Sequence, residues 1–456
     1  MLKKKTFKRG IHPLHHQGGG KRPTKNLPIE DYVSDSVVIN MAMNIGAPAT
    51  PCVKKGDQVK IGQVIGTPNG FMSVPVHASI SGEVVAVEQI PYLGAGNVMA
   101  VTIKNDFTDE WVDDLKPLGS VENVDPALVI PAIREAGITG MGGASFPTHV
   151  KLTFKEGAVC DTILVNGAEC ETHLTADHRL MLENSVRIVD GLRAVMRALN
   201  VEKGIIAIED NKPDAIAAME KAAFGREGVR VQPLKTKYPQ GGEKQLITAV
   251  TGRQVPAGKL PIDCHVVVLN VGTCAAIADA VIDGKPLVSR ICTVTGCVKT
   301  PKNLRIPIGT IVEDMIGACG GFSEEPGKIF FGGAMTGIAI PNIQTPTAKS
   351  TNGVVVFNEH EAKSLDESAC IRCGRCVAAC PVGLNPYKIK VAADASDFDA
   401  AEKLHVMDCM LCGSCAFVCP ARRWLTPSFR FAKEKITAEK KAAAQKAAAE
   451  KGGIDK

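Results

Sequence analysis

Two copies of one cysteine pattern near the C-terminus constrain this chain more than any other feature of its sequence. Each copy has the form C-x2-C-x2-C-x3-C-P, and together they use eight of the sixteen cysteines. Three thiolates at this spacing fit one face of a 4Fe-4S cubane, while the fourth reaches across to a second cluster. The pattern predicts one cluster on Cys370, Cys373, Cys376 and Cys419, and another on Cys409, Cys412, Cys415 and Cys380.

Zinc is the main alternative, because paired C-x-x-C units also form tetrahedral sites. Four thiolates in each run, with Pro381 and Pro420 directly after them, favour iron–sulfur clusters, which exchange single electrons. Ligand thiolates suit a reducing compartment and argue against a disulfide framework. The other cysteines lack ligand spacing, and we expect small buried hydrophobes at Cys52, Cys160, Cys170, Cys264, Cys274, Cys292, Cys297 and Cys319.

The N-terminal extension, residues 1–27, has eight lysines and arginines up to Asn26 and no acidic residue. Such a segment could lie against anionic lipid or an acidic partner, and a solvated disordered arm is an equal alternative. We expect its histidines, His12, His15 and His16, to make packing or partner contacts more often than metal bonds. The N-terminus lacks the apolar core of a secretory signal, and no apolar run in the chain is long enough to span a bilayer.

The length of 456 residues predicts several domains, and frequent glycine with few aromatics suits β-rich modules joined by tight turns. Residues 28–106 read as short strands separated by glycines. The phrase from Val53 to Gly66, followed by residues 76–84, resembles the lipoyl/biotinyl barrel-sandwich hybrid. Its expected hairpin tip, Pro68 to Met72, has no lysine to modify. The module is therefore expected to dock without a swinging arm.

An α/β domain is expected over residues 117–286. Asp125-Pro126 begins a short predicted helix that ends at Gly137, and a glycine-rich loop follows to Thr148. Glycines let backbone N–H groups approach a phosphate or a ring, and Lys151 adds positive charge nearby. This loop is neither a Walker A loop nor a G-x-G-x-x-G fingerprint.

Polar residues follow predicted strands in the same domain. Asn166, Glu169 and Glu171 come after one apolar strand, and Asn270 and Thr273 come after another. A further glycine–acid turn contains Gly242 and Glu243. Ligands of open α/β sheets lie outside the carboxyl ends of the strands, so these segments argue for one binding site.

These elements, in this order, resemble the flavin- and NADH-binding subunit of respiratory complex I. Together with the N-terminal histidines, the lipoyl-like module and the twin cysteine runs, they more closely resemble the C subunit of the Rnf complex. Residues 290–350 resemble the β-grasp-like SLBB module, which we expect to be structural. The expected fold class is thus multidomain α/β and α+β, ending in an α-helical two-cluster ferredoxin-like domain over residues 360–432, because the insert between the cysteine runs is helical in pattern.

The resemblance implies an FMN site, a nicotinamide nucleotide site and no general acid or covalent nucleophile. The FMN residues would be Gly140, Gly142, Lys151, Asn166, Glu169, Gly242, Glu243, Asn270 and Thr273, and the nucleotide residues Gly143, Ala144, Phe146 and Glu171. Three positions depart from the complex I pattern: Met141 replaces an arginine, Ala168 an aspartate and Lys244 a second glutamate.

The resemblance further implies a membrane-bound ferredoxin:NAD+ oxidoreductase that drives Na+ or H+ transport through partner subunits, among them a ferredoxin-like iron–sulfur subunit. The chain would lie peripherally on the cytoplasmic side of the cell membrane and bind no nucleic acid. A soluble flavin and iron–sulfur cobalamin reductase and a non-catalytic electron relay are the alternatives. The tail, residues 433–456, has high helix propensity but little apolar face, which predicts a solvated, fraying helix.

Overall fold

The first module is a barrel-sandwich hybrid, as expected, whose short strands alternate buried and less buried residues. The computed structural model describes residues 3–93 and 96–452. Val37 and Ile39 on one strand are fully buried, and they share a core with Ile65 from the facing sheet. The two antiparallel sheets have the orders β2-β8-β7-β4 and β3-β5-β6. Their strands are β2 (Ser36–Asn40), β3 (Thr50–Pro51), β4 (Gln58–Val59), β5 (Val64–Thr67), β6 (Val76–His77), β7 (Gly82–Pro91) and β8 (Asn97–Asn105).

The α/β domain is built on a four-stranded parallel sheet in the order β11-β10-β9-β12. Its strands are β9 (Thr162–Gly167), β10 (Gly204–Glu209), β11 (Val229–Leu234) and β12 (Val266–Asn270). Its helices are α1 (Pro126–Glu135), α2 (Thr148–Leu152), α3 (Ala176–Glu183), α4 (Ser185–Ala198), α5 (Pro213–Ala223), α6 (Glu243–Thr251), η2 (Pro261–Cys264) and α7 (Val271–Asp283). The predicted start of α1 is confirmed, because the Asp125 side chain accepts a hydrogen bond from the N–H of Ala127.

Helices α4 and α7 pack against each other at a glycine. A Cβ atom at Gly191 would lie 1.8 Å from the carbonyl oxygen of Cys274. The helix backbones therefore approach more closely than a side chain allows.

A β-grasp module follows, and it recruits a strand from the start of the chain. Its sheet has the order β1-β14-β13-β17-β15-β16, in which β1 pairs in parallel with β14. The elements are β1 (Ile29–Asp31), β13 (Ser289–Gly296), β14 (Lys302–Pro307), α8 (Val312–Ala318), β15 (Pro326–Phe331), β16 (Ile338–Ala339) and β17 (Gly353–Asn358). The sheet thus extends beyond the range of 290–350 expected for this module. It includes β1, from the range expected for the barrel module, and β17, which follows residue 350.

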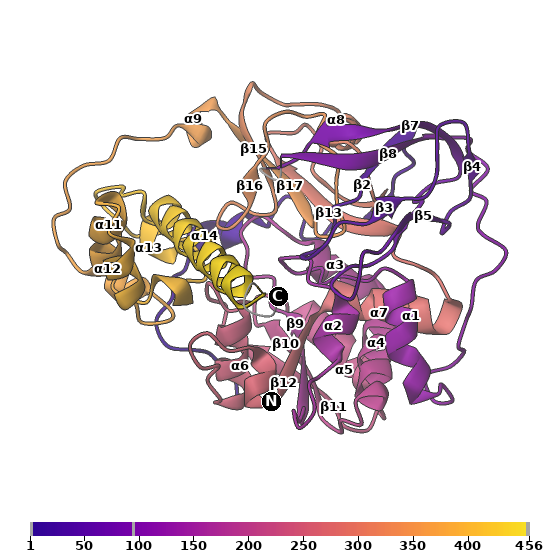
Figure 1. Ribbon diagram of the computed structural model, residues 1–456, viewed down its shortest axis with the longest axis horizontal. Coiled ribbons are helices and arrows are strands. Elements are labelled where there is room, and N and C mark those ends of the chain that lie inside the picture. Colours follow the sequence, from indigo (N-terminus) through magenta and orange to yellow (C-terminus); the bar gives the residue numbers. More distant parts are fainter. Residues whose placement is uncertain (1–2, 94–95, 453–456) are drawn as a thin grey trace.

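The C-terminal part is a small helical domain, and the helices expected between the cysteine runs are present as α11 and α12. In Figure 1 it lies to one side of the other modules, joined to the β-grasp module by a long segment after α9. Phe429, Ala432 and Ile436 of the last helix are buried against it. The elements are α9 (Glu359–Ala362), α10 (Arg375–Ala379), α11 (Pro386–Asp394), α12 (Phe398–Lys403), η3 (Val406–Asp408), α13 (Ser414–Phe417) and α14 (Leu425–Gly452).

The N-terminal arm, residues 3–27, is packed against two domains. Lys5 and Ile11 form β-bridges with Leu234 and Tyr238 of the α/β domain, and Phe7 and Ile11 are buried. The N–H of Gly10 donates to the carbonyl of Ala379 in the helical domain. The arm also contains η1 (His15–Gly20), where the side chains of His15 and His16 lie outside the described residues. The alternative of a solvated disordered arm is therefore wrong.

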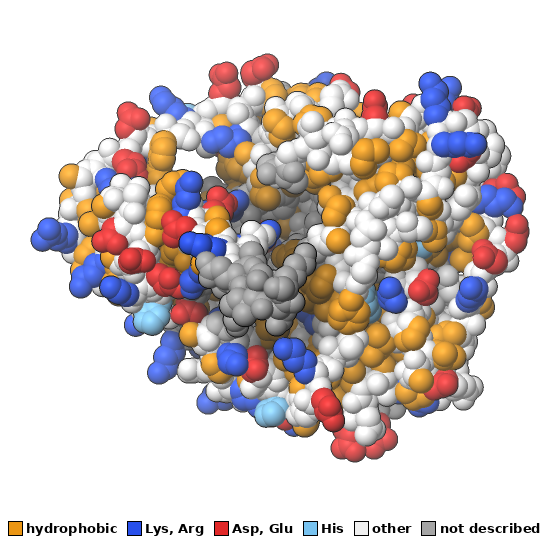
Figure 2. All heavy atoms as spheres, viewed as in Figure 1, with side chains coloured by type: hydrophobic (Ala, Val, Ile, Leu, Met, Phe, Trp, Pro, Cys, Tyr) orange, Lys and Arg blue, Asp and Glu red, His pale blue; other side chains and the backbone are white. Residues whose placement is uncertain are grey.

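Several of the arm's charges are used within the chain. Lys4 pairs with Asp210 at 2.9 Å, and Lys21 is buried. Figure 2 shows positive and negative side chains interspersed over one face, without one continuous patch of either sign. Within the described ranges, no helix has the length and apolar character needed to cross a bilayer.

Candidate flavin and iron–sulfur sites

The expected flavin residues gather at the carboxyl edge of the parallel sheet, around β9 and β12. These two strands are neighbours, and the chain continues from β9 to β10 on one side while β12 lies on the other. Such a reversal of strand order opens a crevice for ligands. The glycine loop reaches this edge, because the N–H of Met141 donates to Thr273 Oγ1 at 3.0 Å.

The glycine loop forms a tight, open turn. The turn is closed by the N–H of Gly140, which donates to the carbonyl of Phe146 at 2.8 Å. Phe146 itself is half-buried. Gly142, Gly143 and Ala144 are exposed. A Cβ atom at Gly142 would lie 3.0 Å from Cβ of Asn270, so a side chain there would crowd the end of β12.

Asn270 and Thr273 occupy the first turn of α7. Asn270 caps the helix, since its Oδ1 accepts from the N–H of Gly272 at 2.8 Å, and its Nδ2 donates to Asp177 Oδ2 at 2.7 Å. Burial raises the pKa of Asp177. Sequence reasoning did not select Asp177, although it lies in the segment shortly after Glu171.

Asn166, Lys151 and Glu243 connect the glycine–acid turn to the same edge. Asn166 Nδ2 donates to the carbonyl of Gly241 at 2.8 Å. Lys151 Nζ lies 3.2 Å from Glu243 Oε1 and 3.1 Å from the carbonyl of Val268. Both side chains of this ion pair remain partly exposed, so they are accessible to a bound anion or ring.

Glu169 is a buried carboxylate beside a buried amine from the N-terminal arm. Its Oε1 accepts from the N–H of Asp177 at 2.7 Å, and Lys21 Nζ lies 3.6 Å from its Oε2. Burial raises the pKa of Glu169 to about 7 and lowers the pKa of Lys21. Lys21 was missed as a site residue because the sequence shows it only as one cation of a basic stretch.

Glu171 points to the β-grasp module. Its Oε1 accepts from the N–H groups of Met335 at 3.1 Å and Thr336 at 2.6 Å. Burial raises its pKa. It also lines a cavity of about 450 Å³ together with Lys21 and Tyr238, at the carboxyl edge of the same sheet. Glu171, one of the expected nucleotide residues, thus has these hydrogen bonds in the β-grasp module and not in the glycine loop.

The residues present fit a flavin mononucleotide. Exposed glycines leave space for a phosphate, Lys151 supplies a cation, and strand-end amides and hydroxyls supply partners for a polar chain. Glu169 Oε2 is buried and has no hydrogen-bond partner, and the Lys21 amine 3.6 Å away is its ion-pair partner, so the oxygen can still accept a hydrogen bond.

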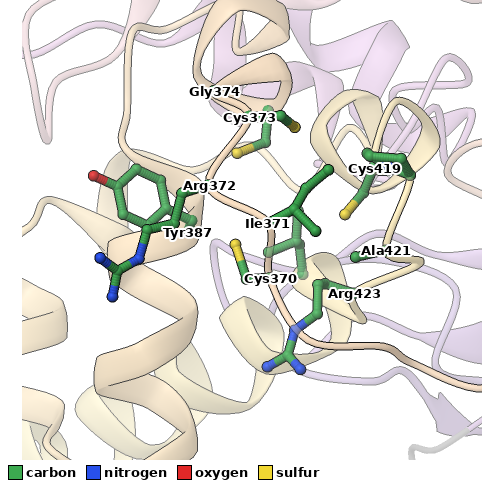
Figure 3. Close-up of a pocket in the computed structure, with 12 residues that line it drawn as sticks. Cys370, Ile371, Arg372, Cys373, Gly374, Tyr387, Cys419, Ala421 and Arg423 are labelled. Atoms are coloured by element: carbon green, nitrogen blue, oxygen red, sulfur yellow. The ribbon is translucent and has the colours of Figure 1, made fainter.

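The eight cysteines of the twin runs line two cavities. Cys370, Cys373, Cys376 and Cys419 line the first. In Figure 3 the sulfur atoms of Cys370, Cys373 and Cys419 face a common space, and the guanidinium groups of Arg372 and Arg423 point away from it. Cys380, Cys409, Cys412 and Cys415 line the second cavity. Each cavity thus brings together the four thiols that the spacing assigns to one cluster, and the ligand roles stay a prediction.

The second cavity is the more buried of the two. Burial raises the pKa of the Cys409 thiol to about 11. Among the side chains that the structure describes, which leave out those of residues 15–17 and 447–452, no three or more His, Cys, Asp or Glu are grouped to hold a single metal ion. The donor set, four thiols around each apolar space, fits a cubane cluster. Of the other cysteines, Cys52 is exposed, which contradicts the expectation that it is buried.

Two residues that sequence reasoning missed join the second cavity to the flavin residues. Tyr238 Oη donates to the carbonyl of Cys412 at 2.7 Å. A Cβ atom at Gly242 would lie 2.6 Å from Cε of Met410, so this methionine touches the glycine–acid turn. Two features of the sequence could have indicated them. Tyr238 lies just before the glycine–acid turn, and Met410 lies between two predicted ligand cysteines.

Comparison with known families agrees with this arrangement. Residues 5–108 match the RnfC barrel sandwich hybrid domain, and residues 133–279 match the Nuo51 FMN-binding domain. Residues 291–339 match the SLBB domain, and residues 362–445 match a 4Fe-4S dicluster domain. The chain therefore carries an FMN-binding domain and a two-cluster 4Fe-4S domain.

Relatives are similar over nearly the whole chain. The C subunit of the Na+-translocating ferredoxin:NAD+ oxidoreductase complex of Acetobacterium woodii is 47% identical over 96% of this chain and 98% of its own length. The C subunit of the proton-translocating complex of Clostridium ljungdahlii is 46% identical over 95% and 94%. The C subunit of the ion-translocating oxidoreductase complex of Rhodobacter capsulatus is 42% identical over 94% and 82%. The chain belongs to the family of C subunits of the ion-translocating Rnf oxidoreductase complexes.

Proposed function

We propose that this chain is the NAD(H)-binding electron-exchange subunit of a membrane-bound ferredoxin:NAD+ oxidoreductase complex. Family membership and the FMN and 4Fe-4S domains support this function. The observation that carries it is the contact of the second cysteine cavity with the flavin domain, through Tyr238 and Met410.

FMN, when bound, exchanges a hydride with nicotinamide and single electrons with iron–sulfur clusters. In this proposal Gly140, Gly142 and Lys151 receive its phosphate side, because they form the open, positively charged part of the site. Asn166, Glu169, Gly242, Glu243, Asn270 and Thr273 complete its walls. The chain's role is to hold the two reactants in line and to keep water from the reacting faces, so no general acid is required.

The nucleotide side is proposed to be the exposed rim of the glycine loop. Gly143 and Ala144 lie open there, and the ring of Phe146 is half-exposed for stacking. Glu171 is bound instead to the β-grasp loop that contains Met335 and Thr336, and its contact with the nucleotide stays a prediction.

The two cavities differ in exposure, which suggests the order of electron transfer. The second cavity abuts the flavin domain, whereas Cys370 and Cys373 of the first cavity are exposed and Ile371 beside them is 68% exposed. We propose that electrons pass between the flavin and a partner subunit through the second cluster and then the first. The partner would be a ferredoxin-like iron–sulfur subunit of the complex, and the chain would lie peripherally on the cytoplasmic side of the membrane.

An anaerobic titration of the purified chain with NADH tests this function. The expected result is about eight irons and one FMN per chain, bleaching of the flavin by NADH, and EPR signals from reduced clusters. Iron without flavin or any response to NADH would instead make the chain a non-catalytic electron relay.

A pair of variants tests the sharing of ligands between the two runs. Cys380→Ser should disturb the cluster of Cys409, Cys412 and Cys415, and the matched variant Cys376→Ser should disturb the other one. The assignment fails if the EPR signals lost by the two variants are exchanged.

A further inference from the structure

Arg290 is a buried arginine of the β-grasp module that reaches the glycine loop of the flavin domain. It lies on β13 and is 5% exposed. Its Nη2 donates to the carbonyl of Met141 at 3.2 Å, and its Nη1 lies 2.9 Å from Sδ of the same residue. Its Nε donates to the carbonyl of Thr351 at 3.4 Å. The side chain thus ties the loop to the β-grasp module.

The contact with the Met141 carbonyl fixes the direction of the next peptide N–H. The peptide bond between Met141 and Gly142 is trans, and in a trans peptide the C=O and the N–H point in opposite directions. Because Arg290 holds the carbonyl on the buried side, the N–H of Gly142 faces the exposed side of the loop. The preceding peptide is held as well, because the N–H of Met141 donates to Thr273 Oγ1.

The charge around this N–H is positive. A Cβ atom at Gly272 would lie 3.1 Å from Arg290 Nη1, which places the guanidinium against the first turn of α7, where the helix dipole is also positive. Among the described residues, the carboxylate that acts on Arg290 is Asp177, which burial makes harder to ionise. The N–H of Gly142 therefore points outward, above the buried guanidinium of Arg290 and the N-terminus of α7. Such a position binds an anionic group better than a neutral ring.

We propose that Arg290 is a positioning residue for the phosphate of FMN, which it serves by orienting the Met141–Gly142 peptide and by supplying buried positive charge beneath it. This inference rests on the proposed FMN site. It gives the β-grasp module a part in flavin binding, where the sequence predicts a structural role only.

Titration of the flavin-free full-length chain with FMN and with riboflavin, which lacks the phosphate, tests the proposal. Arg290→Met should weaken FMN binding at least about tenfold, because a hydrogen-bonding charge is lost, and should leave riboflavin binding unchanged. Arg290→Lys keeps the charge and should recover part of the affinity for FMN. Arg305→Met is the matched control, since Arg305 lies on the adjacent strand, is partly exposed and pairs with Asp31 at 2.8 Å.

The outcomes separate the proposal from a general defect in folding. An equal loss of FMN and riboflavin binding in Arg290→Met, or unchanged binding of both, would overturn the role of Arg290. If Arg290→Met does not fold, or if riboflavin binding is too weak to measure, stabilisation by inorganic phosphate is measured for Arg290→Lys. Phosphate should then raise the melting temperature of the wild type and of Arg305→Met more than that of Arg290→Lys, and equal shifts would refute the proposal. Failure of the wild type to bind FMN would refute the proposed function itself.

Discussion

Gly191→Ala should disturb the flavin site through the first turn of α7, which contains its contact partner Cys274. The added Cβ would lie 1.8 Å from the carbonyl oxygen of Cys274, where real contacts stay at or above 3.0 Å. Helix α7 must therefore shift by about 1 Å relative to α4, because both contacting groups are backbone or rigidly attached to it. The first turn of α7 carries Asn270 and Thr273, so the shift reaches the glycine loop.

The expected cost follows from two opposing effects. Replacing glycine by alanine within a helix gains about 0.5–1 kcal/mol from helix propensity. Overpacking at a rigid contact typically costs about 1–3 kcal/mol and sometimes more. The net loss should lower the apparent melting temperature by a few degrees, since about 1 kcal/mol corresponds to about 2–4 °C for a domain of this size.

Gly317→Ala in α8 is the matched control. A Cβ atom there meets nothing within 4 Å, and no positive φ is involved. This variant should gain about 0.5–1 kcal/mol and raise or leave unchanged the melting temperature. Calorimetry and FMN titration of both variants check the argument. If Gly191→Ala behaves like Gly317→Ala in both assays, the reasoning from the α4–α7 contact is wrong.

Three further perturbations have definite expected results. Tyr238→Phe removes the hydrogen bond to the carbonyl of Cys412 and should cost about 1–3 kcal/mol, seen as a lower melting temperature and slower cluster reduction by NADH. Phe429→Ala removes a side chain that is 1% exposed and should lower the free energy of unfolding of the helical domain by about 3–5 kcal/mol. Loss of iron during urea unfolding measures this change. Burial lowers the pKa of Lys349 to about 7, so the folded state holds fewer protons than the unfolded state from about pH 7 to 10, and stability should rise with pH in that window. Lys349→Met should flatten this rise in denaturation experiments at pH 7 and 9, and an unchanged slope would count against the assignment.

The cysteine pairing and the glycine loop could be predicted because their chemistry is local in the sequence. A thiol at a fixed spacing or a glycine in a turn signals its role within a few residues. The positions of Asn166 and Asn270 at strand ends could also be predicted, because an apolar run ends directly before each of them.

Apart from Asp177, which bonds to Asn270 within the α/β domain, the residues that were missed make their contacts across domain boundaries. The departure at Met141, where the complex I pattern has an arginine, was visible in the sequence, but the guanidinium that reaches this turn comes from Arg290, 149 positions away. Lys21 and Tyr238 likewise meet their partners through tertiary packing. The arm was expected to be solvated or to lie against anionic lipid or an acidic partner, because its charge dominates its sequence. In the structure Phe7 and Ile11 of the arm are buried.

The packing of the N-terminal arm has a consequence for the order in which this chain folds. The arm is synthesised long before its contact partner in the helical domain, because the N–H of Gly10 donates to the carbonyl of Ala379. The arm can therefore connect the flavin domain to the helical domain only after residue 379 has been translated.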